Sequence, residues 1–291
     1  MRIADNMRFR FAQSQLTNLT ARQSEAARRA MTGRRVNTPS SDPVAAVELT
    51  KLEGRLQRVN SYRDSIRLTR GDAAIAENAL AEAQSLFVRA RELAVQGANE
   101  TLNAGDRNQL SSIVASLRDQ LVSIANTRGA SGYLFAGSQT DAPAFDPDGT
   151  FLGDNYEHRV EVGPGVVTTI NVSGENAFTS AGGIDTFQVL TDLAQALENN
   201  DTDAITATLS QLDTASEQIV RTQSSAGLLI NRLDTADQSL EQSEISLRSR
   251  KGEMGDADAF ETISELTAVN TALEQAISVT RLTLGQGVNR F

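Results

Sequence analysis

Several residue types are scarce in this chain of 291 residues, and each scarcity excludes a kind of chemistry. There is no cysteine, so the chain can form no disulfide and offers no thiolate nucleophile or metal ligand. A single histidine, His158, leaves no basis for a Ser-His-Asp catalytic arrangement. Ten Phe, three Tyr and no Trp are few aromatic side chains for the core of a globular enzyme. A thin helical bundle needs fewer of them, and the composition favours that class of fold.

Proline is also scarce, and its distribution is uneven. The five prolines lie in two short stretches, 39–43 and 143–164. Residues 44–142 and 165–291 contain none. Because proline breaks helix interiors, two long blocks without proline favour long helices.

Long apolar runs are absent as well. No run of 18 apolar residues occurs, so no membrane insertion is expected. Arg2, Arg8 and Arg10 interrupt any apolar segment at the start, so no cleaved signal peptide is expected either.

The net charge of −10 is concentrated in the middle of the chain. Residues 141–220 hold 14 acidic side chains and one basic side chain, Arg159. An acidic middle argues against nucleic acid as a partner and fits a well-solvated outer surface. The ends differ in sign: residues 1–50 carry eight Arg and four acids, and residues 251–291 carry three bases and six acids. Opposite signs favour pairing of the two ends.

What the chain does have is a seven-residue repeat of apolar or small side chains in two segments. In the first segment the repeat comprises Leu52, Val59, Ile66, Ala73, Leu80, Phe87 and Ala94. In the second it comprises Ile205, Leu212, Ile219, Ala226, Leu233, Leu240, Leu247 and Met254. A heptad repeat keeps one side of a helix facing a partner, as in a coiled coil. The predicted fold is therefore mainly α: a long antiparallel helical coiled-coil rod with a small β-rich insertion at the middle of the chain.

Start and stop signals give the order of the elements. Ser41 or Asp42 can cap a helix that begins at Pro43, and Asp201 can cap the long return helix. Gly252 and Gly255 are expected to interrupt that helix after about residue 250. Helices are expected at about residues 2–31, 44–100, 106–127, 185–199, 203–250 and 257–285. Alternating side chains predict a pair of strands at 156–162 and 166–172, joined by a turn at 163–165.

Neither catalysis nor metal binding finds support in the residues. His158 falls on the apolar side of a predicted strand, where a structural role is expected. Asp146, Asp148, Asp154 and Glu157 match four positions of a calcium loop, but Phe151 stands where glycine is required. No catalytic residue, cofactor or metal is therefore predicted.

The terminal segments are amphipathic but have little other core to join. A lone helix pair buries too little surface to offset the entropy of ordering it, so these ends should order when other subunits cover them. The basic N-terminal helix could instead lie on a membrane, although its Gln, Asn and Ser content weakens that interpretation.

Three stretches resemble the flagellin superfamily: MRIADNMRF at the start, TGRRVNTPSSDPVAA at 32–46 and GYLFAGSQTDAPAF at 132–145. Filament flagellins usually carry a DDAAG-like run where this chain has Asp42-Pro43-Val44-Ala45-Ala46, so the match is closer to the hook–filament junction members. Ser41-Asp42 replaces two adjacent acids, a mild departure. The insertion carries no resemblance of its own.

The resemblance implies a structural, non-enzymatic part of the extracellular bacterial flagellum, exported unfolded without a cleaved signal. It implies a terminal assembly segment at 1–45 plus 253–291, disordered in the monomer, a helical rod domain at 46–135 plus 186–252, and a β-rich outer domain at 136–185. The implied inter-subunit residues are Ile3, Met7, Phe11, Leu16, Leu19, Ile263, Leu266, Leu273, Ile277 and Leu284. The implied partners are other copies in a ring, the neighbouring hook-associated junction protein, flagellin and an export chaperone.

Other functions remain open at this point. A short flagellin would build the filament itself and would be present in thousands of copies. A cytoplasmic coiled-coil adaptor would have protease-resistant ends and would not be exported. An enzyme in the insertion has no residues to support it.

Overall fold

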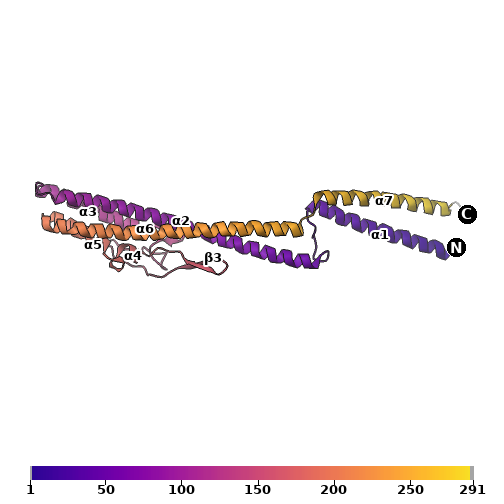
Figure 1. Ribbon diagram of the computed structural model, residues 1–291, viewed down its shortest axis with the longest axis horizontal. Helices are drawn as coiled ribbons and strands as arrows, with labels where there is room; N and C mark the ends of the chain where they lie inside the picture. The colour runs from indigo at the N-terminus through magenta and orange to yellow at the C-terminus, as the bar shows by residue number, and fades with distance from the viewer. Residues whose placement is uncertain (1, 289–291) are drawn as a thin grey trace. The chain divides into compact units, whose positions relative to one another are not determined.

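The computed structural model describes the backbone of residues 2–288 and the side chains of residues 6–7 and 9–282. Two compact units divide the chain: a terminal unit of residues 1–58 and 243–291, and a central unit of residues 59–242. The longer elements are α1 (Arg2–Thr32), α2 (Pro43–Gly97), α3 (Ala104–Ala125), α5 (Thr186–Glu198), α6 (Thr202–Gly255) and α7 (Ala259–Val288). Long helices with a few short strands in the middle confirm the predicted mainly α fold, which Figure 1 shows.

In the central unit, α2 and α6 lie side by side and antiparallel (Figure 1). The predicted seam residues of this unit are buried on both helices, with Leu80, Ile205 and Ile219 each 0% exposed. Small seam residues such as Ala83 and Ala90, also 0% exposed, let the two backbones approach closely. The heptad repeat therefore correctly predicts which side of each helix is buried.

Within the central unit, three ion pairs between described residues cross the α2–α6 interface at its edge. Arg63 Nε lies 2.8 Å from Asp237 Oδ1, and Arg70 Nε lies 2.5 Å from Asp234 Oδ1. Farther along, Arg91 Nε lies 2.8 Å from Asp213 Oδ1. Residue numbers rise on α2 as they fall on α6, so these pairs mark the register of the two helices.

A second layer, α3 and α5, packs on this helix pair. Leu110, Leu117 and Leu121 of α3 belong to the same core as Leu193 and Leu197 of α5. The Asn103 side chain caps α3 by accepting a hydrogen bond from Asp106 N at 2.9 Å. The sequence predicts a turn at residues 103–105, and α3 begins within this turn, at Ala104.

The middle of the chain holds the short elements. These are β1 (Arg128–Gly129), β2 (Gly132–Tyr133), β3 (Arg159–Gly163), β4 (Val166–Thr169), α4 (Gly174–Phe178) and the 3-10 turn η1 (Ser180–Gly182). β1 pairs with β2, and β3 pairs with β4, each as an antiparallel hairpin. Of these two hairpins, only β3–β4 lies within the predicted β-rich domain at 136–185, and β1–β2 precedes it.

Aromatic side chains attach this middle segment to the helices. The Phe145 ring centroid lies 5.2 Å from that of Phe151, 5.6 Å from Phe178 and 5.2 Å from Phe187 on α5. Phe135 packs edge-on against Phe178 at 5.4 Å. The cluster joins the helical core, so residues 136–185 pack against the helices within the central unit.

The hairpin is shorter than the sequence predicts. Its first strand begins at Arg159, three residues after the expected start. The reason lies in side-chain competition: Asp154 Oδ1 accepts the Tyr156 N–H, and Asn171 Oδ1 accepts the His158 N–H. These side chains take the backbone donors that a longer ladder would use.

The return helix α6 runs through Gly252 and ends at Gly255, so the expected break at Gly252 is wrong. A Cβ on Gly255 would lie 3.0 Å from Leu49 Cδ2 of α2, and a Cβ on Gly252 would lie 3.1 Å from Asp256 Oδ2. A glycine inside a long helix costs only about 1 kcal/mol, which neighbouring turns of α6 offset.

Candidate assembly surface

The terminal helices α1 and α7 form an antiparallel pair within the terminal unit (Figure 1). Gln23 Nε2 donates a hydrogen bond to Asn270 Oδ1 at 2.8 Å, and Arg29 Nη1 lies 3.5 Å from Glu265 Oε2. These contacts set the register, with Thr280 lying near Gln13 at the far end. A basic helix thus pairs with an acidic one, as the charge distribution predicts.

Backbone hydrogen bonds join the segment that follows α1 to the segment that precedes α7. Gly33 ends α1 in the left-handed region with φ of 64°, and its carbonyl accepts a hydrogen bond from Ala257 N at 2.9 Å. Arg35 N donates to Gly255 O at 2.8 Å, and the Arg35 guanidinium donates to Met254 O at 2.7 Å. The chain leaving α1 is therefore bonded to the chain entering α7.

Asp42 completes this anchor and caps α2. Its carboxylate accepts the Ala45 N–H at 3.0 Å and lies 3.1 Å from Arg35 Nη1. The Ala45 hydrogen bond, followed by the Arg35 hydrogen bond, lowers the pKa of Asp42 below its usual range. The residue is predicted from sequence as a cap, and its contact with Arg35 is an addition from the structure.

The interface between α1 and α7 is thin. Among the described side chains of these two helices, only Ala26, Thr262 and Val269 are fully buried. In the central unit, by contrast, whole Leu and Phe side chains are enclosed. The pair therefore buries little apolar surface by itself, and most of its apolar side chains face outward.

The predicted inter-subunit residues divide into two groups. Leu16, Leu19, Leu266 and Leu273 are half-buried and form the contact between α1 and α7. Met7, Phe11, Ile263 and Ile277 are exposed, with Met7 68% exposed and Phe11 65% exposed. The side chains of Ile3 and Leu284 lie outside the described residues.

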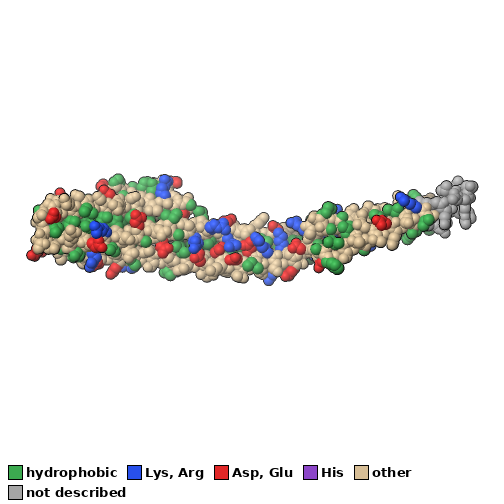
Figure 2. All heavy atoms as spheres, turned by 90° about the horizontal axis from the view of Figure 1, so that it is seen from above, with side chains coloured by type: hydrophobic (Ala, Val, Ile, Leu, Met, Phe, Trp, Pro, Cys, Tyr) green, Lys and Arg blue, Asp and Glu red, His purple; other side chains and the backbone are tan. Residues whose placement is uncertain are grey.

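Five further large apolar side chains are exposed on the described parts of these helices and are not predicted from the sequence. Phe260 is 83% exposed and Met31 is 80% exposed, and the others are Phe9, Val279 and Leu282. The helical period could have identified them, since each falls off the face that the partner helix covers. Figure 2 shows hydrophobic side chains at the surface of the terminal helices, among scattered charges.

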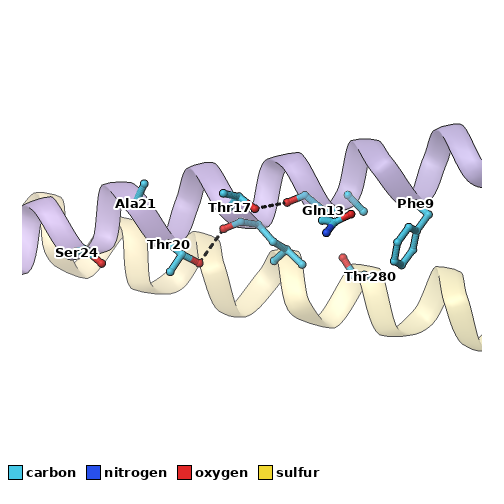
Figure 3. A pocket seen from close by; sticks show the side chains of 9 residues that line it. Phe9, Gln13, Thr17, Thr20, Ala21, Ser24 and Thr280 are labelled. Carbon is cyan, nitrogen blue, oxygen red and sulfur yellow. Dashed lines mark hydrogen bonds between the residues drawn. The ribbon is translucent and has the colours of Figure 1, made fainter.

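A shallow groove of about 580 Å³ runs along α1 beside Thr280 of α7. Its walls are small or uncharged side chains: Phe9, Ala12, Gln13, Leu16, Thr17, Thr20, Ala21 and Ser24. Figure 3 shows Phe9 at one end and Ser24 at the other, with Thr280 opposite.

The other residues considered for chemistry have structural contacts. His158 Nε2 lies 3.1 Å from Gly137 O, and its ring packs edge-on against Tyr156. Asp146 accepts the Thr150 N–H at 2.7 Å, within a turn closed by Gly149 N and Asp146 O at 3.0 Å. Within the described residues, no cluster of acidic or histidine side chains could hold a metal ion.

Asp154 also has a structural role. It accepts hydrogen bonds from the hydroxyl and the backbone N–H of Ser138, which lower the pKa of its carboxyl group.

The described part of the chain contains no helix that combines the length and the apolar character needed to span a membrane.

Comparison with known proteins identifies the family. The bacterial flagellin N-terminal helical region matches residues 3–140, and the bacterial flagellin C-terminal helical region matches residues 209–282. Together these regions cover more than two thirds of the chain, including α1, α2, α3, the greater part of α6 and most of α7.

Relatives and solved structures agree with the family match. Flagellar hook-associated protein 3 of Escherichia coli (strain K12) is 25% identical over 315 residues, covering 100% of this chain and 99% of that protein. The protein of the same name from Salmonella typhimurium is 29% identical over 182 residues, or 62% of this chain and 57% of the relative. The crystal structure of Bacillus cereus FlgL shares the fold, with a TM-score of 0.61 and 20% identity over 69% of this chain and 99% of that one. The chain therefore belongs to the flagellin family of structural flagellar proteins, and the relative that it matches over its whole length is a hook-associated protein 3.

Proposed function

We propose that this chain joins the hook-associated proteins of the bacterial flagellum to the filament, and that α1 and α7 make the contacts between subunits. The observation that carries the proposal is the thin α1–α7 interface, with exposed apolar residues such as Met7, Phe11 and Phe260 along it. Exposed apolar surface on a helix pair with so little buried core is typical of a face that another subunit covers. The full-length likeness to hook-associated protein 3 supports the same role.

The proposed roles of the three parts of the chain are those expected from the sequence. Residues 1–45 plus 253–291 serve as the assembly segment, which orders when neighbouring subunits cover it. Residues 46–135 plus 186–252 supply the helical support, and residues 136–185 face outward. Burial of these apolar faces against other subunits would offset the entropy cost of ordering α1 and α7, which the pair cannot offset by itself.

The proposed partners are other copies in a ring, the neighbouring hook-associated protein and flagellin. Before assembly, an export chaperone covers the apolar terminal faces, and the chain leaves the cell without a cleaved signal peptide. A chaperone contact is testable by co-purification of the chain from cells that cannot export flagellar proteins.

A deletion of the gene tests the function. The expected phenotype is bare hooks by electron microscopy, with monomeric flagellin in the medium, because filament subunits are exported but find no junction. Bare hooks without any major flagellin in cells or medium would instead identify this chain as the filament subunit. Intact filaments would contradict both functions, and complementation with the wild-type gene controls for effects on neighbouring genes.

A further inference from the structure

One face of α1 carries no charge from its start to its end among the described side chains. The residues recur at helical spacing and are exposed: Phe9, Gln13, Thr17, Thr20, Ser24 and Met31. Charged side chains make up 22% of the chain, and a solvated helix face normally carries several of them. The groove beside Thr280 lies along this face.

The two threonine hydroxyls on this face are already satisfied. Thr17 donates to Gln13 O at 2.9 Å and Thr20 donates to Leu16 O at 2.8 Å, as Figure 3 shows. A threonine bonded to the carbonyl four residues earlier presents its methyl group to the surroundings and does not need water. These two threonines can therefore lose their water without leaving an unpaired donor.

A face of α7 has the same character from Phe260 to Thr271, one turn before the exposed Glu274. Its residues are Phe260, Ile263, Ser264, Thr267 and Thr271, all exposed and uncharged. Thr267 donates to Ile263 O at 2.9 Å, and Thr271 donates to Thr267 O at 2.9 Å. Phe260, at 83% exposed, is the largest side chain on this ridge. An uncharged ridge with its threonine hydroxyls satisfied complements an uncharged groove.

We propose that the α1 groove of one copy receives the Phe260–Thr271 ridge of a second copy. This inference rests on the proposed function and names the pair of faces that meet between subunits. The absence of charge on both faces means that neither loses an ion pair or a solvated charge when water leaves.

Phe260 of the ridge cannot reach Thr20 in the groove of its own chain. Gln23 pairs with Asn270, so Thr20 lies level with about residue 273 on α7. Phe260 is about 13 residues from that level, an axial separation of about 20 Å. The contact therefore joins two copies through different patches, which builds a ring or a helical row rather than a two-fold dimer.

Disulfide trapping tests this contact directly, because the wild-type chain has no cysteine. The double variant Thr20→Cys/Phe260→Cys is expressed in flagellated cells, and isolated hook–junction structures are oxidised and run without reductant. We expect covalent trimers and larger species, because each copy carries one cysteine in its groove and one on its ridge and can be linked to two other copies. Thr20→Cys alone and Phe260→Cys alone should each stay monomeric.

A matched control uses Asn18, which is exposed on the opposite side of α1. Asn18→Cys/Phe260→Cys should give no more than a tenth of the cross-linked product. A double variant that gives no more product than this control overturns the proposal. Efficient dimers from Thr20→Cys alone also overturn it, because they would place two grooves face to face.

A photo-reactive p-benzoylphenylalanine at Thr20 identifies the occupant by mass spectrometry of the adduct. A peptide containing Phe260 from another copy supports the proposal, and a flagellin peptide overturns it. The deletion phenotype is a separate result: cells that retain filaments without this protein contradict the proposed function, whatever the cross-linking shows. Circular dichroism of each purified variant verifies that these exposed substitutions leave the helices intact.

Discussion

At the scale of single residues, Arg107 stabilises one end of the central unit. It is 4% exposed, and its guanidinium donates to Gly97 O at 2.7 Å, to Asn99 O at 2.8 Å and to the Asn200 side chain. It thus satisfies carbonyl groups where α2 ends and ties them to the turn between α5 and α6. Neither charge pattern nor periodicity identifies this role, because the partners are two backbone carbonyls near the end of α2 and the side chain of Asn200, 93 residues away.

We predict that Arg107→Ala lowers the free energy of unfolding by about 3 kcal/mol, since two buried carbonyls and an amide lose their partners. Urea unfolding followed by circular dichroism measures the change. Arg89→Ala is the control: Arg89 pairs with Glu92 at the surface, and its loss should cost less than about 1 kcal/mol. Equal effects of the two variants would refute the role of Arg107.

The Arg63–Asp237 pair predicts a dependence of stability on pH. The Arg63 hydrogen bond holds the pKa of Asp237 below its usual range. A lowered folded-state pKa means that the contribution is present above about pH 4, the ordinary aspartate value, and is lost as pH falls through the folded-state value.

Asp237→Asn should therefore lower the melting temperature at about pH 7 and have almost no effect at about pH 2. Thermal unfolding of the variant and the wild-type chain across this range measures the difference. Because other carboxylates titrate equally in both proteins, the difference reports on Asp237. A constant difference at every pH would show that the effect comes from packing.

At the scale of elements, the glycines inside α2 differ in their surroundings. Gly71 has open space where a side chain would stand, whereas a Cβ on Gly97 would lie 2.3 Å from Leu197 Cδ2. We predict that Gly71→Ala raises the free energy of unfolding by about 0.5–1 kcal/mol, because alanine loses less backbone entropy in a helix. Gly97→Ala should lower it, because Leu197 must move. Thermal unfolding of the two variants tests both signs, and a destabilised Gly71→Ala would contradict the argument.

The elements also show how far the sequence predicts the fold. The heptads predict the buried side of α2 and α6. Asp201 is correctly predicted as a cap, with its Oδ1 accepting the Ala204 N–H at 3.0 Å. Of the two alternatives for the cap of α2, Ser41 and Asp42, the structure has Asp42. The Phe145 cluster is not predictable, because its rings come from segments without periodicity. The assembly residues are predicted in part: the pattern indicates amphipathic ends, but only the register of α1 on α7 separates half-buried Leu273 from exposed Phe260.

At the scale of the whole molecule, the two units should respond differently to substitution. Leu273 is half-buried between α1 and α7, outside the central unit. We predict that Leu273→Asp prevents incorporation into the flagellum but leaves the melting transition of the central unit unchanged, because a charge there disrupts only the terminal pair. Immunoblotting of isolated flagella and calorimetry of the purified chain measure the two outcomes. Normal incorporation, or collapse of the main transition, would refute the separation of roles.

The pairing of α2 with α6 also determines when the chain can fold. Arg63 and its partner Asp237 are 174 residues apart, and Leu80 and Phe87 share a core with Ile205 and Leu212. A chain that emerges with its N-terminus first presents half of this core long before the other half exists. Closing so large a loop is slow, because entropy must be lost before the distant contacts form. The core between α2 and α6 therefore cannot close until the last third of the chain has followed.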